Sequence, residues 1–222
     1  MACERHPAAG EFGLYCPACL LEEALAAPAP FAGGGSADPT ADEDIDFEQL
    51  TIQLPLGRSE AASVFLVTQA TVPGRLYRLK AWRSPAASGF VDRVRRLKVQ
   101  LAGWQEPAVD APLAALVDAT GCPSIVGPFR RGMPILDVLH SGNLDARAAA
   151  AHIDSLAQVV VRAHARGLPH GSIVPGNVMV HAGTAYLLDF GLTGLLRPST
   201  SQADLMASDL AGLAALERAL AP

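Results

Sequence analysis

Two polar side chains between residues 168 and 191 could together bind a divalent cation. Asn177 and Asp189 are separated by two short apolar runs, 178–180 and 185–188, with a turn at 181–184. This pattern predicts a β-hairpin with polar residues at its open end, where Asn177 and Asp189 would lie close in space. Amide and carboxylate oxygens are hard ligands, so the pair is suited to Mg²⁺ held on nucleotide phosphates.

The same stretch resembles the catalytic core of eukaryotic-type Ser/Thr protein kinases, whose pattern is H-R-D-x-x-x-x-N followed by D-F-G. Here His170, Ser172 and Asn177 stand at the first, third and last positions of the first motif, and residues 189–191 read Asp-Phe-Gly. The resemblance places Ser172 where an active kinase has the Asp that acts as catalytic base, and Val174 where it has a Lys. It therefore implies a kinase fold whose base position is degenerate.

The resemblance also implies a phosphate-binding loop near residue 57, where the family has G-x-G-x-x-G-x-V. Only Gly57 and Val64 match that pattern, because Ser59 and Ala62 replace the second and third glycines. Backbone N–H groups approach a phosphate closely only where no Cβ intervenes. We therefore expect this loop to hold phosphate poorly.

Lys80 stands where the family has the strand Lys that pairs with nucleotide phosphates, and Met179 where an apolar side chain forms the floor beneath the purine. An exposed Lys in water and ordinary core packing of Met179 are the alternatives. Arg78 replaces a small residue that faces the adenine, and a buried guanidinium there would fill the purine slot or need an acidic partner. The predicted helix at 86–104 contains no Glu to pair with Lys80, and Asp92 is its only acid.

Three further residues have structural roles in the family that the resemblance carries over. His170 and Phe190 are expected in the core. Asp209 matches an acid that accepts backbone hydrogen bonds from the catalytic loop, although an exposed acid at a helix N-terminus would suit Ser208-Asp209 equally well.

The first 26 residues contain two pairs of potential metal ligands, Cys3-x-x-His6 and Cys16-x-x-Cys19. Paired knuckles of this spacing supply four ligands for a tetrahedral Zn²⁺, which would contribute the folding energy of so small a segment. The alternative is a set of reduced thiols and a surface His. The segment resembles zinc-ribbon-like heads that precede some bacterial kinases.

The chain has 222 residues, half of them hydrophobic, and a net charge of −5. This length allows one domain, or one domain with a small appendage. The negative charge gives no indication of a nucleic-acid surface. No apolar run reaches the ~18 residues of a membrane span, and the N-terminus lacks a basic-then-apolar signal, which favours the cytoplasm.

We expect four segments: a zinc-ribbon-like head at 1–26, a Pro/Gly-rich flexible linker at 27–44, a kinase-like N-lobe at 45–129 and a C-lobe at 130–222. The expected fold class is α+β and bilobal, with an antiparallel sheet plus a helix in the N-lobe. The C-lobe is expected to be helical and truncated, because a complete kinase domain is longer. Strands are predicted at 50–56, 62–69, 75–82, 113–119 and 124–129, and helices at 86–104, 134–139 and 145–166.

Three functions remain open from the sequence. The first is a pseudokinase that serves as a regulatory or scaffolding module for a protein partner that the sequence does not identify. The second is a weak or unconventional ATP-dependent protein kinase that uses Lys80, Asn177 and Asp189. The third is a zinc-headed adaptor with an inert kinase-like part. The basic run 93–98 is most simply a solvated face, although it could bind an acidic partner.

Overall fold

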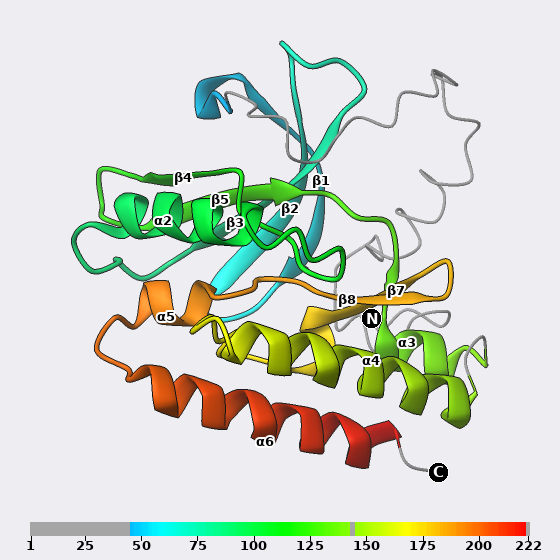
Figure 1. Cartoon of the computed structure of the whole chain (residues 1–222). Coiled ribbons are helices and arrows are strands. Elements are labelled where there is room, and N and C mark those ends of the chain that lie inside the picture. Colours follow the sequence, from blue (N-terminus) through cyan, green and yellow to red (C-terminus); the bar gives the residue numbers. More distant parts are fainter. Residues whose placement is uncertain (1–44, 143–144, 221–222) are drawn as a thin grey trace. The chain divides into compact units, whose positions relative to one another are not determined.

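The computed structural model describes residues 45–142 and 145–220, which form two compact units (Figure 1). Within the described residues the first unit contains 45–85 and 113–129, and the second contains 86–112 and 130–220. Both the predicted zinc ligands, Cys3, His6, Cys16 and Cys19, and the predicted linker 27–44 lie outside the described residues. The chain is α+β, with an antiparallel sheet and several helices, and this architecture is compatible with a kinase-like fold.

The first unit is built on a five-stranded antiparallel sheet with strand order β1-β2-β3-β5-β4. The strands are β1 (Leu50–Arg58), β2 (Ala62–Gln69), β3 (Leu76–Trp82), β4 (Ala114–Val117) and β5 (Pro123–Pro128). A short 3₁₀ turn, η2 (Phe47–Gln49), precedes β1 and is capped by the Asp46 side chain, which accepts from the Glu48 backbone N–H. All five strands were predicted from their apolar content to within a few residues.

One face of this sheet carries a small hydrophobic core. Val67, Tyr77, Leu113 and Val126 are buried there, and Phe47 of η2 packs against them. Tyr77 and Val67 are directly opposite each other in the β2–β3 ladder. Aromatic and β-branched side chains fit such paired positions well, which explains why these segments form strands.

The second unit begins with α2 (Phe90–Ala102), which buries the apolar stripe that the sequence predicted. Its buried residues are Phe90, Val94, Leu97 and Leu101. This helix packs on α5 (Leu192–Leu196), so residues 86–112 group with the second unit rather than with the sheet. The sequence-based division places residues 86–112 in the predicted N-lobe, 45–129.

Helix α4 (Ala146–His164) is the centre of the second unit and was predicted as a helix over 145–166. Asp145 caps its N-terminus, since its side chain accepts from the Ala148 N–H at 2.7 Å. The residues predicted to face inward are all buried: Ile153, Leu156, Val160 and Ala163. Short α3 (Ile135–His140) precedes α4, and α6 (Gln202–Leu220) runs alongside it (Figure 1).

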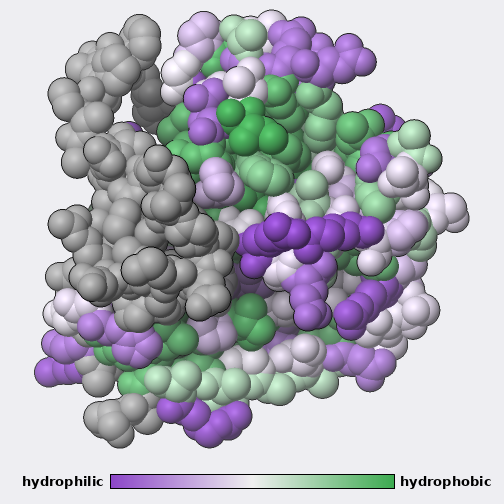
Figure 2. Space-filling view, turned by 180° about the vertical axis from the view of Figure 1, so that it is seen from behind, coloured by the Kyte–Doolittle hydropathy of each residue, from purple (hydrophilic) through white to green (hydrophobic). Residues whose placement is uncertain are grey.

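Helix α6 contains only one ionisable residue between positions 205 and 216, namely Asp209, and that residue is fully buried. The exposed residues in the middle of α6 are therefore uncharged: Ala207, Ser208, Leu210, Ala211 and Ala215. Figure 2 shows this part of α6 as a pale band along the lower edge of the view. Among the helices of the described residues, none is long and apolar enough to span a membrane.

Candidate functional site

The predicted hairpin is present in the second unit and is formed by β7 (Val178–His181) and β8 (Thr184–Leu187). With β6 (Met133–Pro134) it forms a three-stranded sheet. Val178 pairs with Leu187, and the Leu188 N–H donates to the Asn177 carbonyl at 2.9 Å. Asn177 and Asp189 therefore flank the open end of the hairpin, one at the start of β7 and the other just after β8.

Both of these side chains are held in defined environments. Asn177 lies in the 3₁₀ turn η3 (Pro175–Asn177), and its Nδ2 donates to the Ser172 carbonyl at 2.9 Å. This bond restrains the amide and leaves Oδ1 with no part in the contact with Ser172. Asp189 is buried, with 7% of its surface exposed, and has a left-handed backbone with φ of 61°. Asp tolerates this conformation better than most residues, and such strain is concentrated at functional sites.

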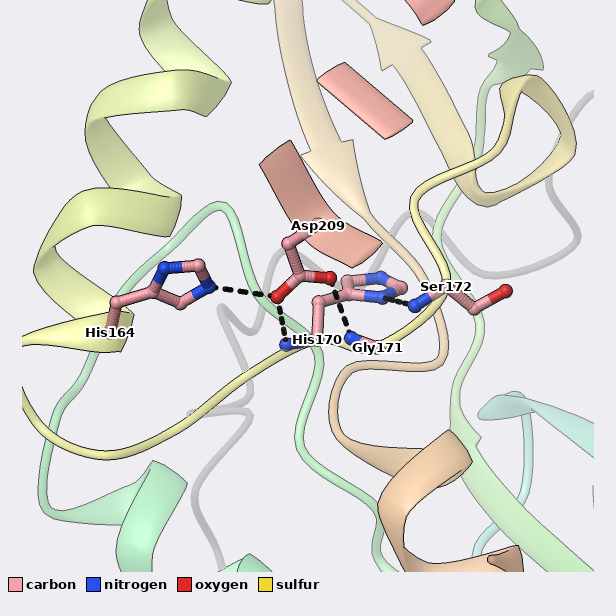
Figure 3. Close-up of polar contacts among 5 residues, drawn as sticks. All are labelled: His164, His170, Gly171, Ser172 and Asp209. Carbon is pink, nitrogen blue, oxygen red and sulfur yellow. Dashed lines mark hydrogen bonds and ion pairs between the residues drawn. The ribbon is translucent and has the colours of Figure 1, made fainter. Parts of the chain in front are cut away.

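Ser172, at the position that the kinase resemblance assigns to the catalytic base, is half-buried in the loop that precedes η3. Its backbone N–H donates to His170 Nδ1 at 3.2 Å. Its hydroxyl points away from both His170 and Asp209 (Figure 3). The main chain of Ser172 therefore contributes to the order of the loop, while its side chain projects from it. Val174, two residues later, is 45% exposed.

Asp209 of α6, which has no exposed surface, fixes the shape of the loop at residues 170–171. Its carboxylate accepts the backbone N–H of His170 at 2.8 Å and that of Gly171 at 2.6 Å. It also contacts Nε2 of His164, on α4, at 2.8 Å (Figure 3). The prediction that Asp209 accepts backbone hydrogen bonds from this loop is confirmed, and the alternative of an acid exposed to water is excluded.

His170 is 1% exposed and lies between the loop and the hairpin. Its Nδ1 accepts from Ser172 N–H, and its Nε2 lies 2.9 Å from the Leu188 carbonyl, to which it donates. One accepting and one donating nitrogen describe a neutral imidazole. Burial lowers the pKa of His170 below its ordinary value of 6.5, and the nearby Asp209 carboxylate opposes this shift only in part.

Phe190 is also 1% exposed and meets the His170 ring edge-to-face at a centroid distance of 5.2 Å. Trp104, after the end of α2, also meets the Phe190 ring edge-to-face, at a centroid distance of 5.9 Å. The core positions expected for His170 and Phe190 are confirmed. The Met179 side chain is half-buried on β7, where it pairs with Tyr186 of β8 and Pro134 of β6.

Sequence reasoning missed three residues that shape this site. His164 contacts Asp209, and the only sequence signal was a His in the last turn of α4. Gly171 has φ of 84°, and a Cβ there would lie 2.9 Å from the Thr193 side chain. Gly212 of α6 lets the helix approach the loop, because a Cβ there would lie 2.4 Å from the Ile173 carbonyl oxygen. These glycines are required by contacts between distant segments, which one sequence does not display.

The remaining predicted nucleotide contacts lie in the first unit. Lys80 on β3 pairs with Val64 of β2, and its Nζ lies 5.3 Å from the centre of the Trp82 ring. Gly57 lies near the end of β1, opposite Val64, and a Cβ there would meet no atom within 4 Å. Packing within the first unit therefore does not require a glycine at position 57. Arg78 is half-buried two residues before Lys80, on the same face of the sheet.

Asp92 is the only acid of α2, and it forms an exposed ion pair with Arg95 of the same helix at 3.2 Å. Across residues 45–142 and 145–220, no group of three or more His, Cys, Asp or Glu side chains is arranged to hold a metal ion. Asn177 and Asp189 are an amide and a single acid, so a cation at the hairpin end would need additional oxygens from a ligand such as a nucleotide.

Comparison with known proteins connects this geometry to kinases. No model of a known protein family matches the chain. A curated relative, the serine/threonine-protein kinase pkn2 of Myxococcus xanthus, is 27% identical over 153 residues, which cover 66% of this chain. The match covers 18% of the length of that relative. Sequence similarity and the α+β architecture together support a kinase-like relationship.

Proposed function

We propose that this protein is a kinase-like regulatory or scaffolding module in which phosphoryl transfer is impaired or absent. The observation that carries the proposal is Ser172. The contacts around it support the proposal: His170 is buried, Asn177 donates to the Ser172 carbonyl, and Asp209 accepts the His170 backbone N–H. The proton-accepting carboxylate is replaced by a hydroxyl.

The chemical consequence follows from the difference between these two groups. A carboxylate orients a substrate hydroxyl and accepts its proton, whereas a Ser hydroxyl is a very weak base. Loss of general-base assistance costs about 10²–10⁴-fold in rate. Val174 supplies no positive charge for the transferring phosphoryl group, and stabilisation of that charge is a large term in catalysis.

The direct test is transfer itself. Purified full-length protein would be incubated with Mg-ATP, alone and with generic protein substrates, and added phosphate would be measured by intact-mass spectrometry. We expect no added phosphate on either. Robust transfer that is lost in Asp189→Ala would overturn the proposal.

The second candidate is a weak or unconventional ATP-dependent kinase, and the hairpin end is the observation that favours it. Asn177 and Asp189 would hold Mg²⁺ there, and Lys80 would contribute charge to the phosphates. A bound Mg-ATP would supply the phosphoryl group, and electrostatic stabilisation does most of the work in its transfer.

Thermal unfolding with and without Mg-ATP shows whether the protein binds the nucleotide, as this second candidate requires. A ligand at 100 times its Kd stabilises the folded state by about 2.7 kcal/mol. A rise in melting temperature that disappears in Asp189→Ala would support the second candidate. No shift in the wild type would count against it.

We further propose that Cys3, His6, Cys16 and Cys19 hold a structural Zn²⁺, that the protein acts in the cytoplasm, and that it binds a protein partner. Metal analysis of the purified protein should find about one zinc per chain, lost in Cys16→Ser. Deleting residues 1–44 and measuring partner capture would reveal a zinc-headed adaptor, since only then would binding depend wholly on this segment.

A further inference from the structure

The loop between β1 and β2 is closed by contacts within the first unit, and most of them involve Arg83. This residue follows β3 directly. Its Nη1 donates to the Ser59 carbonyl at 2.6 Å and to the Glu60 carbonyl at 2.9 Å, and its backbone N–H donates to the Ala61 carbonyl at 3.0 Å. Three consecutive loop carbonyls thus converge on one residue.

A fourth contact joins Arg83 to the beginning of β2, where its Nη2 donates to Ser63 Oγ at 2.8 Å. The loop also closes on itself through Ser59. The Ser59 N–H donates to the Ala62 carbonyl at 2.8 Å, and the Ala62 N–H donates to Ser59 Oγ at 3.1 Å. The residues that replace the second and third glycines of the kinase pattern are therefore bonded to each other.

The direction of these carbonyl groups decides what the loop can bind. A phosphate cradle needs successive backbone N–H groups that converge on an anion. Here successive carbonyl oxygens converge on a guanidinium, which is a cation with donors in a rigid fork. Glu60 at the tip of the loop adds a negative charge. The carbonyl groups of the loop therefore favour a cation, and the Arg83 guanidinium is that cation.

We propose that Arg83 is an internal strap that holds the β1–β2 loop closed, so that the loop takes no part in binding a nucleotide phosphate. The inference rests on the proposed function, because it concerns the nucleotide-binding role that a kinase-like relationship assigns to this loop. The proposed function attributes impaired phosphoryl transfer to the substitution at position 172. The strap adds a second cause, namely that Arg83 keeps the β1–β2 loop from binding a nucleotide phosphate.

Hydrogen–deuterium exchange of the full-length protein tests the strap through peptides that cover residues 58–64. Arg83→Ala removes the side-chain contacts and should raise exchange in this peptide about tenfold, since the loop amides then open locally. Arg83→Lys keeps the charge without the fork and should give an intermediate increase. Arg58→Ala, an exposed Arg in the same hairpin, is the control and should leave exchange unchanged.

Unchanged exchange in both Arg83 variants would overturn the inference, as would slower exchange of this peptide in the wild type on addition of Mg-ATP. If Arg83→Ala does not fold, the comparison of Arg83→Lys with Arg58→Ala still decides the question. Phosphate transfer by the wild type, with the loop insensitive to Mg-ATP, would refute the proposed function and leave the strap supported. Slower exchange of the loop on addition of Mg-ATP, without phosphate transfer, would refute the strap and leave the proposed function supported.

Discussion

The buried underside of the loop at 168–173 and its outer side differ in how completely they match an active kinase. Beneath the loop, Asp209 has no exposed surface and accepts two backbone N–H groups while contacting His164. On the outer side, Ser172 stands where the kinase resemblance assigns the catalytic base, and Val174 is 45% exposed. The same short segment thus combines a buried structural anchor with a position that departs from the kinase pattern.

This difference shows that the shape of a catalytic-type loop and its chemistry depend on separate residues. The shape requires buried hydrogen-bond partners, because a buried N–H without an acceptor is costly. The base contributes its carboxylate to a substrate rather than to the loop. A substitution at position 172 can therefore remove chemistry and leave the scaffold unchanged.

Removing the anchor should produce the largest effect. Asp209→Ala leaves two buried N–H groups and His164 without their acceptor, and we expect it to lower the free energy of unfolding by about 3–5 kcal/mol. Urea denaturation measures this change. Glu217→Ala, on the exposed side of the same helix, should change stability by less than about 0.5 kcal/mol. Equal losses in the two variants would break the comparison.

Two glycines sharpen the same contrast with a smaller effect. Gly212→Ala forces a Cβ to within 2.4 Å of the Ile173 carbonyl oxygen, so α6 must move away from the loop. We expect a loss of about 1–3 kcal/mol in urea denaturation, the usual range for overpacking. Gly57→Ala meets no atom within 4 Å and should be close to neutral. A neutral Gly212→Ala would show that the approach of α6 to the loop is not tight.

The pH dependence of stability tests whether His170 is buried as a neutral ring. The pKa of His170 is lowered in the folded protein from 6.5. Above pH 6.5 neither state carries the proton, so this contribution is constant. As the pH falls below 6.5 the unfolded chain binds a proton and the folded protein does not, so stability falls by up to about 1.4 kcal/mol per pH unit until the folded pKa is reached.

Urea denaturation at several pH values between 7.5 and 5 measures this slope. The slope should be smaller in His170→Gln, and it should persist in His181→Gln, whose side chain is exposed on β7. His164 also contacts Asp209, so His164→Gln is needed to separate the contributions of the two rings. A slope that is the same in His170→Gln and the wild type would show that His170 is not the group responsible.

The smallest effect is expected at the degenerate position itself. The Ser172 hydroxyl points away from Asp209 (Figure 3), so Ser172→Ala should change the free energy of unfolding by less than about 0.5 kcal/mol. Thermal and urea unfolding both measure this. A loss above 1 kcal/mol would mean that the hydroxyl supports the loop, and the separation of shape from chemistry would then fail.

Much of this fold could be predicted from local patterns. The stripe of Phe90, Val94, Leu97 and Leu101 has helical spacing, and the strands of the first unit have the expected apolar content. The hairpin at 178–187 followed from two apolar runs and a turn. The boundary between the compact units was harder, because residues 86–112 are assigned by packing of α2 on α5, which periodicity does not reveal.

The site was predictable where a motif named a residue and unpredictable where distant segments meet. Asp209 was found by resemblance, but water exposure remained open until its hydrogen bonds to His170 and Gly171 were seen. Arg83 was missed because nothing in its sequence neighbourhood indicates that it bonds to residues 59–63. Such contacts depend on the pairing of β2 with β3, which places Ala62 directly opposite Trp82, 20 positions away in the sequence.

Native-state hydrogen exchange at residues 168–173, with and without Mg-ATP, shows whether Asp209 alone fixes this loop. If Asp209 fixes the loop without a ligand, the amides of His170 and Gly171 should exchange only through global unfolding, at the same rate whether or not Mg-ATP is present. Rapid exchange that Mg-ATP slows would contradict this expectation, because the loop would then depend on a nucleotide for its order.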